Sequence, residues 1–159
     1  MRKRVGQMAG AQEQALLDQV KPILDGMGFS LVELHLGRSK RQSYLSVVVY
    51  RPEGVGIDEC AAISRNLLPR LELLDWLPDL RLEVSSPGLD RVLKSSEEFG
   101  IFRGRGLKVW KEGAEDWIEG INEGLAGGVL RLSRSGGTVE IPLAQIRKAK
   151  LDASSEAGA

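Results

Sequence analysis

The spacing of apolar residues changes once along the chain, near Pro87 and Gly88, and this change predicts two structural units. Before it, apolar residues recur at helical spacing in two segments and alternate in three others, as in strands. After it, short apolar runs are separated by glycines, as in small all-β proteins. The chain has 159 residues, which is enough for two small cores. The sequence therefore predicts an α+β protein with a mixed N-terminal part and an all-β C-terminal part.

The N-terminal part begins with a predicted helix and two strands. The helix is indicated by apolar residues at spacings of three and four, namely Leu16, Val20, Ile23, Leu24 and Met27. Pro22 lies inside this run, and we expect it to bend the helix or to mark its start. Alternating patterns predict strands at 29–36 and 44–50, with a solvated hairpin loop between them.

A second helix and a third strand complete this part. We expect Asp58 to be the helix N-cap, because its carboxylate can accept hydrogen bonds from free amide hydrogens. One helix face carries Cys60, Ile63, Leu67, Leu71 and Leu74. Pro69 is expected to bend this helix or to end it early, and alternation predicts a strand at 80–84. The order α-β-β-α-β, a three-stranded sheet with two helices, is that of one type of KH domain.

KH domains bind single-stranded RNA through a Gly-x-x-Gly loop between two helices, and that loop is missing here. The literal match at 124–127 lies in the all-β part and is interpreted as a hairpin. Glycine-separated strands at 107–111, 117–121, 129–132, 138–141 and 146–149 predict a small SH3/Sm-like barrel, in which closure removes exposed edges.

Between the two parts we expect a joint. Proline cannot donate to a strand ladder and glycine permits positive φ, so the third strand should stop at Ser85, Ser86, Pro87 and Gly88. Ser95 and Ser96 are expected to cap a short helix over 97–102. The predicted organisation is an α/β domain at 11–86, a joint at 87–103 and a barrel at 104–152, with disordered tails at 1–10 and 153–159.

Charge and composition restrict the possible functions. The chain has 22 basic and 22 acidic residues, so it is no polybasic nucleic-acid clamp, and any RNA binding must come from local patches. The start, MRKRVGQMAG, lacks the apolar run of a signal peptide, and we expect a cytoplasmic protein without membrane contact. Three local basic clusters are candidates for phosphate binding, against the alternative of ordinary surface charge: Arg38, Lys40 and Arg41; Arg103, Arg105 and Lys108; Arg147, Lys148 and Lys150.

Lys148 and Lys150 form the best-organised pair of these candidates, because side chains two apart on a strand share a face. Catalysis finds less support. The single histidine, His35, is a weak base candidate in a predicted strand, and the single cysteine, Cys60, is expected to be structural. These two residues cannot build a zinc site alone, so we expect no metal and no cofactor.

The segment LEVSSPGLDRVL at 82–93 resembles the hallmark of the bacterial ribosome maturation factor RimP family. The resemblance extends to GMGFSLVELHL, GIDECAAISRNLLPRLE, WIEGINEGLAGGVLRL and IPLAQIRKAKL, and so covers residues 16–151. The family usually has proline after the Asp-Arg pair, where this chain has Val92, and the tryptophan and proline of 76–78 are also unusual. These departures bear on the stiffness of the joint.

The resemblance implies a non-enzymatic, monomeric factor that binds the free small (30S) ribosomal subunit and helps it mature. The implied contacts are ribosomal protein uS12, near the decoding centre, and ribosomal RNA, with the barrel taking part. In the joint, formed by Ser85, Ser86, Pro87, Gly88, Leu89, Asp90 and Arg91, we expect Pro87 to restrict the chain, Gly88 to let it turn, and Asp90 and Arg91 to pair or to bond across the domains.

Two alternatives remain open at this point. The chain would act as a general RNA-binding regulator if it used the barrel and the basic patches without a role in assembly. It would act as a small hydrolase if His35 or Cys60 were catalytic, although the sequence has no convergent nucleophile and base.

Overall fold

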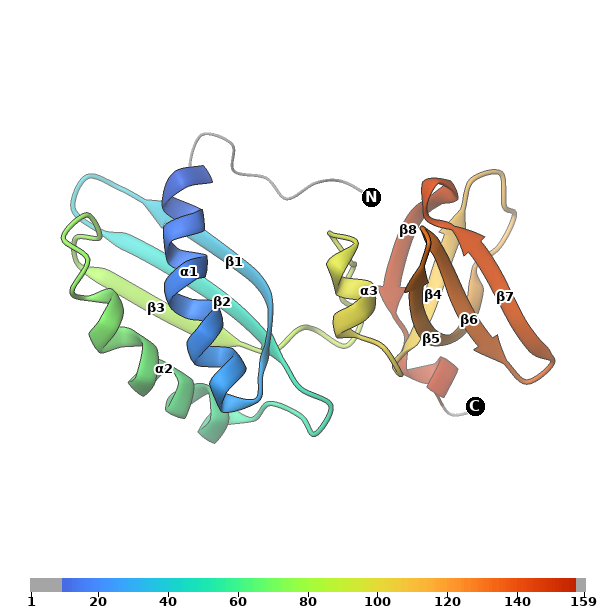
Figure 1. The fold of residues 1–159 in the computed structure, drawn as a ribbon, viewed down its shortest axis with the longest axis horizontal. Coiled ribbons are helices and arrows are strands. Elements are labelled where there is room, and N and C mark those ends of the chain that lie inside the picture. Colours follow the sequence, from blue (N-terminus) through green and yellow to red (C-terminus); the bar gives the residue numbers. More distant parts are fainter. Residues whose placement is uncertain (1–9, 157–159) are drawn as a thin grey trace. The chain divides into compact units, whose positions relative to one another are not determined.

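The computed structural model describes residues 10–156, and contacts within it divide the chain into two compact units between Pro87 and Gly88 (Figure 1). The N-terminal unit has the predicted order of elements. Its helices and strands are α1 (Gly10–Met27), β1 (Ser30–Arg38), β2 (Ser43–Tyr50), α2 (Ile57–Leu71) and β3 (Leu80–Ser85). The predicted tail at 1–10 lies outside the described residues except for Gly10, which begins α1.

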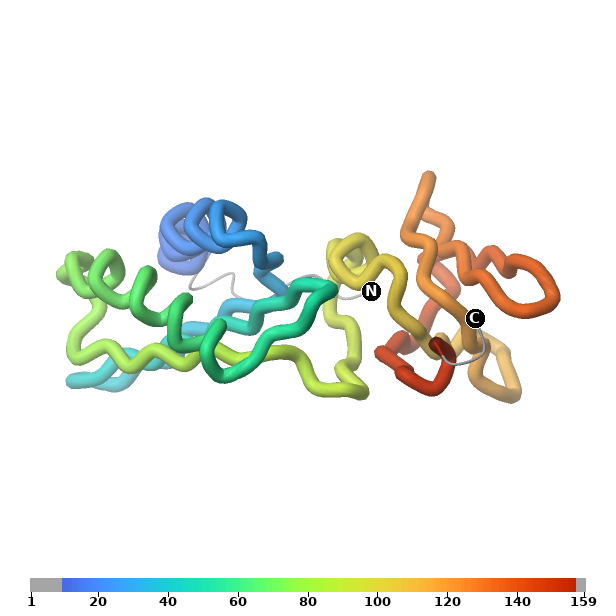
Figure 2. Tube along the Cα trace, turned by 90° about the horizontal axis from the view of Figure 1, so that it is seen from below, coloured from blue at the N-terminus to red at the C-terminus, as the bar shows by residue number. Residues whose placement is uncertain are grey.

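The N-terminal sheet has the strand order β1-β2-β3. β1 is antiparallel to β2, and β3 is parallel to β2, which requires the crossover that α2 supplies. Both helices lie on the same side of the sheet (Figure 2). The opposite face carries no helix of this unit, so the strands can present alternate side chains to solvent there. This arrangement confirms the predicted three-stranded sheet with two helices.

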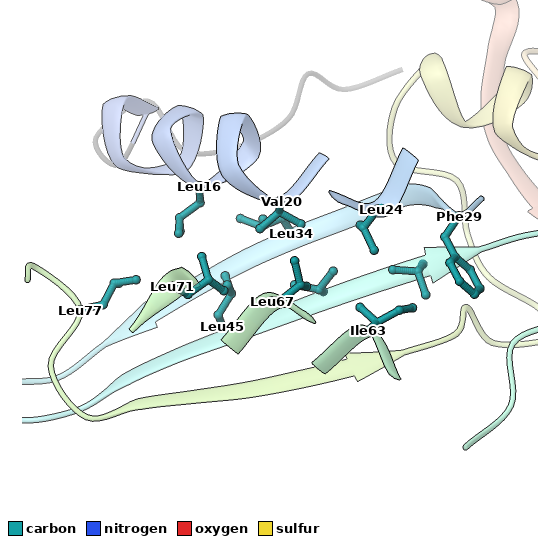
Figure 3. Packing of buried hydrophobic residues seen from close by; sticks show 12 residues of the cluster. Leu16, Val20, Leu24, Phe29, Leu34, Leu45, Ile63, Leu67, Leu71 and Leu77 are labelled. Carbon is teal, nitrogen blue, oxygen red and sulfur yellow. The ribbon is translucent and has the colours of Figure 1, made fainter. Parts of the chain in front are cut away.

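One apolar core joins the helices to the sheet (Figure 3). Leu16, Val20 and Leu24 descend from α1 at helical spacing, and α2 contributes Ile63, Leu67 and Leu71 in the same way. Burial of each of these side chains contributes about 1.5–3 kcal/mol. The remaining members of the buried cluster come mostly from alternate positions of the strands: Phe29, Leu34, Leu45, Val47, Val49 and Leu77.

The prolines and the N-cap depart from the sequence predictions. Pro22 neither starts nor ends α1, which continues to Met27. α2 likewise continues past Pro69 to Leu71, because the buried face on either side of the proline holds the last turn against the sheet. The prediction of Asp58 as N-cap is wrong. Gly56 is the N-cap, and its N–H donates to Glu59 Oε1 at 2.6 Å, so a residue inside the first turn supplies the capping carboxylate.

The C-terminal unit is a five-stranded antiparallel sheet with the order β7-β6-β5-β4-β8. The short helix predicted before it is present. The 124–127 segment does not lie between strands as predicted: residues 124–126 end β5, and only Gly127 is in the hairpin turn to β6. Closure of the sheet into a barrel stays a prediction. The elements are α3 (Glu97–Ile101), β4 (Gly106–Lys111), β5 (Ile118–Ala126), β6 (Val129–Arg134), β7 (Gly137–Pro142), η1 (Leu143–Gln145), β8 (Ile146–Leu151) and η2 (Ala153–Glu156).

The prediction of a disordered tail from residue 153 is wrong for 153–156, which form η2; residues 157–159 lie outside the described part. Glu156 holds this turn, because its Oε2 accepts hydrogen bonds from Arg105 Nε at 2.9 Å and from the Gly106 N–H at 3.0 Å. In the part of the chain that the structure describes, no helix is both long and apolar enough to cross a membrane.

Candidate functional site

The predicted joint contains a turn that does not depend on glycine. β3 ends at Ser85, and the Arg91 N–H donates to the Gly88 carbonyl at 3.2 Å, which closes a turn over Leu89 and Asp90. Gly88 does not adopt the positive φ that glycine permits. A Cβ added there would meet only Asp90 Oδ1, at an ordinary 3.7 Å. The turn therefore does not require glycine at position 88.

Arg91 forms a buried ion pair with Glu98. Arg91 Nε lies 2.7 Å from Glu98 Oε1, and the Lys94 N–H donates to the other carboxylate oxygen at 3.0 Å. The two paired side chains are only 9% and 2% exposed, whereas Asp90 is exposed. Glu98, in the first turn of α3, thus offers the arginine a buried partner within its own unit, whereas the Asp90–Arg91 pair stays a prediction.

The chain on either side of Val92 joins the C-terminal sheet. The Leu93 N–H donates to the Ala149 carbonyl and the Leu151 N–H donates to the Arg91 carbonyl, both at 2.9 Å. Val92 itself forms an isolated antiparallel bridge with Lys150. Neither of these hydrogen bonds uses the amide of position 92. A proline at this position would therefore keep the same hydrogen bonds to β8 as Val92 does.

The first basic cluster lies at the β1–β2 hairpin and is partly structural. Arg38 donates to Gln12 Oε1 at 2.6 Å and to the Trp76 carbonyl at 3.1 Å, which ties the end of β1 to α1 and to the segment before β3. Lys40 and Arg41 are exposed at the tip of the hairpin. Of this cluster, the two tip residues are the better candidates for contact with a partner.

The second basic cluster does not form one patch. Arg105 is engaged by Glu156, and Arg103 lies against Gly124, where an added Cβ would be 3.7 Å from its Cδ. Burial and hydrogen bonds act in opposite directions on Glu156: burial raises its pKa, but the Gly106 amide and Arg105 outweigh this effect and lower it. Of this cluster, Lys108 is the residue on β4, where it faces away from the buried side of the sheet and lies opposite Lys150 of the third cluster.

The third basic cluster divides in the same way. Arg147 pairs with Glu112 at 2.5 Å, whereas Lys148 and Lys150 lie on one face of β8 on either side of the fully buried Ala149. The prediction that these two lysines point together agrees with the structure. Their neighbours on β4 follow from the register, in which Lys108 is opposite Lys150 and Trp110 is opposite Lys148.

Two tryptophans complete this face, and sequence reasoning did not single them out. On the other side of β4, Lys108 is opposite Glu119 and Val109 is opposite Ile118, and Trp117 directly precedes β5. The two indoles pack edge to face, with ring centroids 5.4 Å apart and planes at 75°. Lys108 Nζ and Lys150 Nζ lie 5.3 and 5.5 Å from the Trp117 ring centroid. We call Lys108, Trp110, Trp117, Lys148 and Lys150 the lysine–tryptophan surface.

The two simple catalytic candidates are separated by the N-terminal sheet. His35 is exposed on β1, between two leucines that face the helix-covered core, so its own side chain points to the opposite face. Cys60 belongs to α2 on the helix side, and burial, followed by the nearby Glu59 carboxylate, raises the pKa of its thiol. A thiol with a raised pKa is a poor nucleophile, and it has no histidine beside it.

These features define a protein with an α-β-β-α-β unit, a hydrogen-bonded turn, and a five-stranded sheet whose outer face carries lysines and tryptophans. The residues that the sequence suggested as catalytic do not converge. Residues 19–90 match the family model of the RimP N-terminal domain, a match that runs from the middle of α1 through β3 to the turn at Asp90. This match covers 72 of the 159 residues and supports an assignment to the RimP family.

Proposed function

We propose that the protein is a maturation factor for the small (30S) ribosomal subunit that acts by binding the free subunit. The family match carries this proposal, because it covers all of β1, β2, α2 and β3 as well as the turn. The protein works as a cytoplasmic monomer, without catalysis and without a cofactor. Its domains follow the boundaries at 11–86, 87–103 and 104–152, and its C-terminal sheet closes as an SH3/Sm-like barrel.

The proposed contacts are ribosomal protein uS12 and ribosomal RNA. The exposed tip of the β1–β2 hairpin, with Lys40 and Arg41, and the lysine–tryptophan surface are the parts that support contact with an anionic partner. Arg38, Arg105 and Arg147 contribute less, because their guanidinium groups already have partners inside the chain. Arg103 remains a candidate on the surface of the C-terminal unit.

The joint from Ser85 to Arg91 has a mechanical role in this proposal. It connects the two units through a hydrogen-bonded turn whose last residue is held by a buried carboxylate. Replacing Gly88 is expected to change subunit binding little, because no positive φ is needed there. Replacing Glu98 is expected to reduce it, because Arg91 then loses the partner that fixes the end of the turn.

A pull-down tests the proposed function. The tagged full-length chain is incubated at moderate salt with separated small subunits, large subunits and assembled ribosomes, and the bound RNA and protein are identified. We expect retention of free small subunits and little of the other two particles. A tagged variant with Lys40→Glu and Arg41→Glu should retain less, whereas Arg131→Glu, an exposed change on β6, should behave like the parent. Retention of none of the particles would contradict the proposal.

A general RNA-binding regulator is the second candidate, and the lysine–tryptophan surface is the observation that favours it. Such a protein would bind unrelated RNAs as well as it binds small subunits, with an affinity that falls steeply and linearly on a logarithmic salt scale. The balanced charge of the chain, with 22 residues of each sign, favours the more selective partner. Equal retention of subunits and unrelated RNA at each salt concentration would favour the regulator.

A further inference from the structure

We propose that the lysine–tryptophan surface binds an unpaired segment of single-stranded RNA, with a base stacked on Trp117 and phosphates held by Lys108, Lys148 and Lys150. The inference rests on the proposed function because ribosomal RNA is the expected source of that segment. The residues that carry it all belong to the C-terminal unit, and the experiment below distinguishes failure of RNA binding from failure of the proposed function.

The surface faces away from the core of the C-terminal unit. Along β4, Leu107 and Val109 are fully buried, so Lys108 and Trp110 between and after them point to the other side. On β8 the same alternation buries Ala149 and Leu151. The register places Trp110 opposite Lys148, and Lys108 between Glu119 and Lys150. Trp117 directly precedes β5 and is joined to this group by its ring contacts with Trp110, Lys108 and Lys150. The five side chains therefore form one patch, with four of them on β4 and β8.

The lysines of this patch are available to an anion. Within the described residues, Lys108, Lys148 and Lys150 have no carboxylate within ion-pair distance, whereas the neighbouring Arg105 and Arg147 are occupied by Glu156 and Glu112. Two carboxylates lie near the patch. Glu119 is opposite Lys108 on β5, and the pKa of Asp152 is lowered by hydrogen bonds from Ser155 and Ser154 and by the nearby Lys108. Three ammonium groups against two carboxylates leave a net positive surface on a chain that is neutral overall.

The tryptophans decide between an RNA and an acidic protein segment. Trp117 is half-buried and fixed at a steep angle against Trp110, so its ring is already oriented before a ligand arrives. The ammonium groups of Lys108 and Lys150 lie over the Trp117 ring. A nucleotide base could stack on the ring in place of these ammonium groups, which would then bind the neighbouring phosphates. A run of carboxylates would satisfy the lysines but has no planar group for the indoles. An unpaired nucleotide segment supplies both groups.

Binding of fluorescein-labelled oligouridylate, ten nucleotides long, to the full chain tests the platform. We expect Trp117→Leu to weaken binding about tenfold or more, as loss of one stacked base does, and Trp117→Phe to stay within about threefold of the parent. Near-ultraviolet circular dichroism and thermal unfolding establish that both variants are folded. If Trp117→Leu is folded and binds as well as the parent, the proposal is wrong. If Trp117→Leu is unfolded, two other variants decide. The proposal is then overturned by an unchanged Kd of a folded Trp117→Ala or by a large loss of affinity with Trp117→Phe.

Salt dependence separates stacking from charge. Lys108→Ala, Lys148→Ala and Lys150→Ala together should lower the slope of log Kd against log salt by about 2, because each phosphate contact to a single strand contributes about 0.7. Trp117→Leu should leave that slope unchanged. Arg65→Ala with Arg70→Ala, two exposed positions on α2, is the charge-matched control for two of the three lysines and should change neither slope nor affinity for this oligonucleotide.

Two competitors and one comparison complete the test. A duplex RNA of the same length and a polyglutamate of equal charge should both compete at least tenfold less well than the single strand, because neither offers an accessible base; equal competition by either overturns the proposal. A parent protein that retains small subunits but does not bind oligouridylate overturns this inference alone. A parent that binds oligouridylate through Trp117 but retains no subunits overturns the proposed function alone.

Discussion

The two units of the chain are stabilised in different ways. The N-terminal unit packs two long helices on one sheet face with an apolar core, and its one fully buried polar residue, Ser43, has no partner for its hydroxyl among the described residues. The C-terminal unit buries Glu98 and Asn122, and both make several hydrogen bonds. Burial of apolar side chains is enough to position the long amphipathic helices, whereas the short strands and turns also need specific hydrogen bonds from buried polar side chains.

Asn122 shows what such an anchor does. Its Nδ2 donates to the Phe99 carbonyl and its Oδ1 accepts from the Gly124 N–H, both at 2.8 Å, while its own backbone bonds the segment at 104–105. It thereby joins α3, the chain before β4 and an irregular stretch of β5 in one fully buried network. The following predictions test whether buried polar groups matter in one unit and not in the other.

The largest expected effect comes from Glu98→Ala. The substitution leaves the buried Arg91 guanidinium without its carboxylate, which costs about 3–5 kcal/mol of unfolding free energy. Chemical denaturation followed by amide signals of the C-terminal unit measures it. The matched control is Glu140→Ala, whose pair with Arg131 is 57% exposed on both sides and should contribute about 1 kcal/mol or less. Similar losses for the two variants would show that burial of the pair is not what matters.

Asn122→Ala should have the next largest effect, a loss of about 2 kcal/mol, because the Phe99 carbonyl and the Gly124 amide lose their partner inside the unit. The same measurement applies. Asn66→Ala is the control in the N-terminal unit, since Asn66 is exposed and its side chain only donates to the Ala62 carbonyl one turn away. A loss at Asn66 as large as that at Asn122 would remove the distinction between the units.

A smaller effect concerns acid pH and the turn η2. The pKa of Glu156 is lowered in the folded protein, where the Gly106 amide and Arg105 outweigh the opposing effect of burial. A lowered pKa contributes stability above the usual carboxyl pKa, and this contribution is lost as pH falls through the folded value. Glu156→Gln should therefore reduce stability by less than about 1 kcal/mol at pH 7, since the pair is partly exposed, and flatten the acid limb of the profile.

Thermal unfolding of the C-terminal unit between pH 7 and pH 3 measures that profile. Glu140→Gln serves as the control because Glu140 is in an exposed pair. A Glu156→Gln variant whose acid limb is as steep as that of the parent would rule out this carboxylate as a source of the pH dependence.

Ser43→Ala should have the smallest effect, a change within about 0.5 kcal/mol in either direction. The Ser43 hydroxyl is buried without a partner in the described part of the chain, so its removal leaves nothing unsatisfied. The Ser43 amide keeps its bond to the Asp79 carbonyl. Denaturation followed by N-terminal amides measures the change, and a loss above about 1 kcal/mol would indicate that the hydroxyl does have a stabilising contact.

Local patterns were sufficient for most elements of the fold. The spacing of Leu16, Val20 and Leu24 predicts α1, and the alternation around Leu82 predicts β3, because each pattern is complete within a few residues of chain. The end of α2 and the turn η2 were missed for the opposite reason. Pro69 is tolerated because distant strands bury its neighbours, and Glu156 is ordered by Arg105, about fifty residues earlier.

The candidate site shows the same limit more clearly. Alternation in Lys108-Val109-Trp110 and in Lys148-Ala149-Lys150 predicts which side chains share a strand face, and this part was correct for the two lysines of β8. The turn after Pro87 was predicted, but Glu98 as a partner of Arg91 was not, since the neighbouring Asp90 offers a local explanation. Glu98 lies in the next helix.

By itself, the sequence determined the order of helices and strands, the apolar faces and the division near Pro87, because each follows from periodicity along the chain. The tertiary structure alone decided that Trp110 lies opposite Lys148, that Trp117 packs against Trp110, and that two lysines approach the Trp117 ring. Strand register is set by pairing between distant segments, and a shift by one residue would turn every one of these side chains to the opposite face.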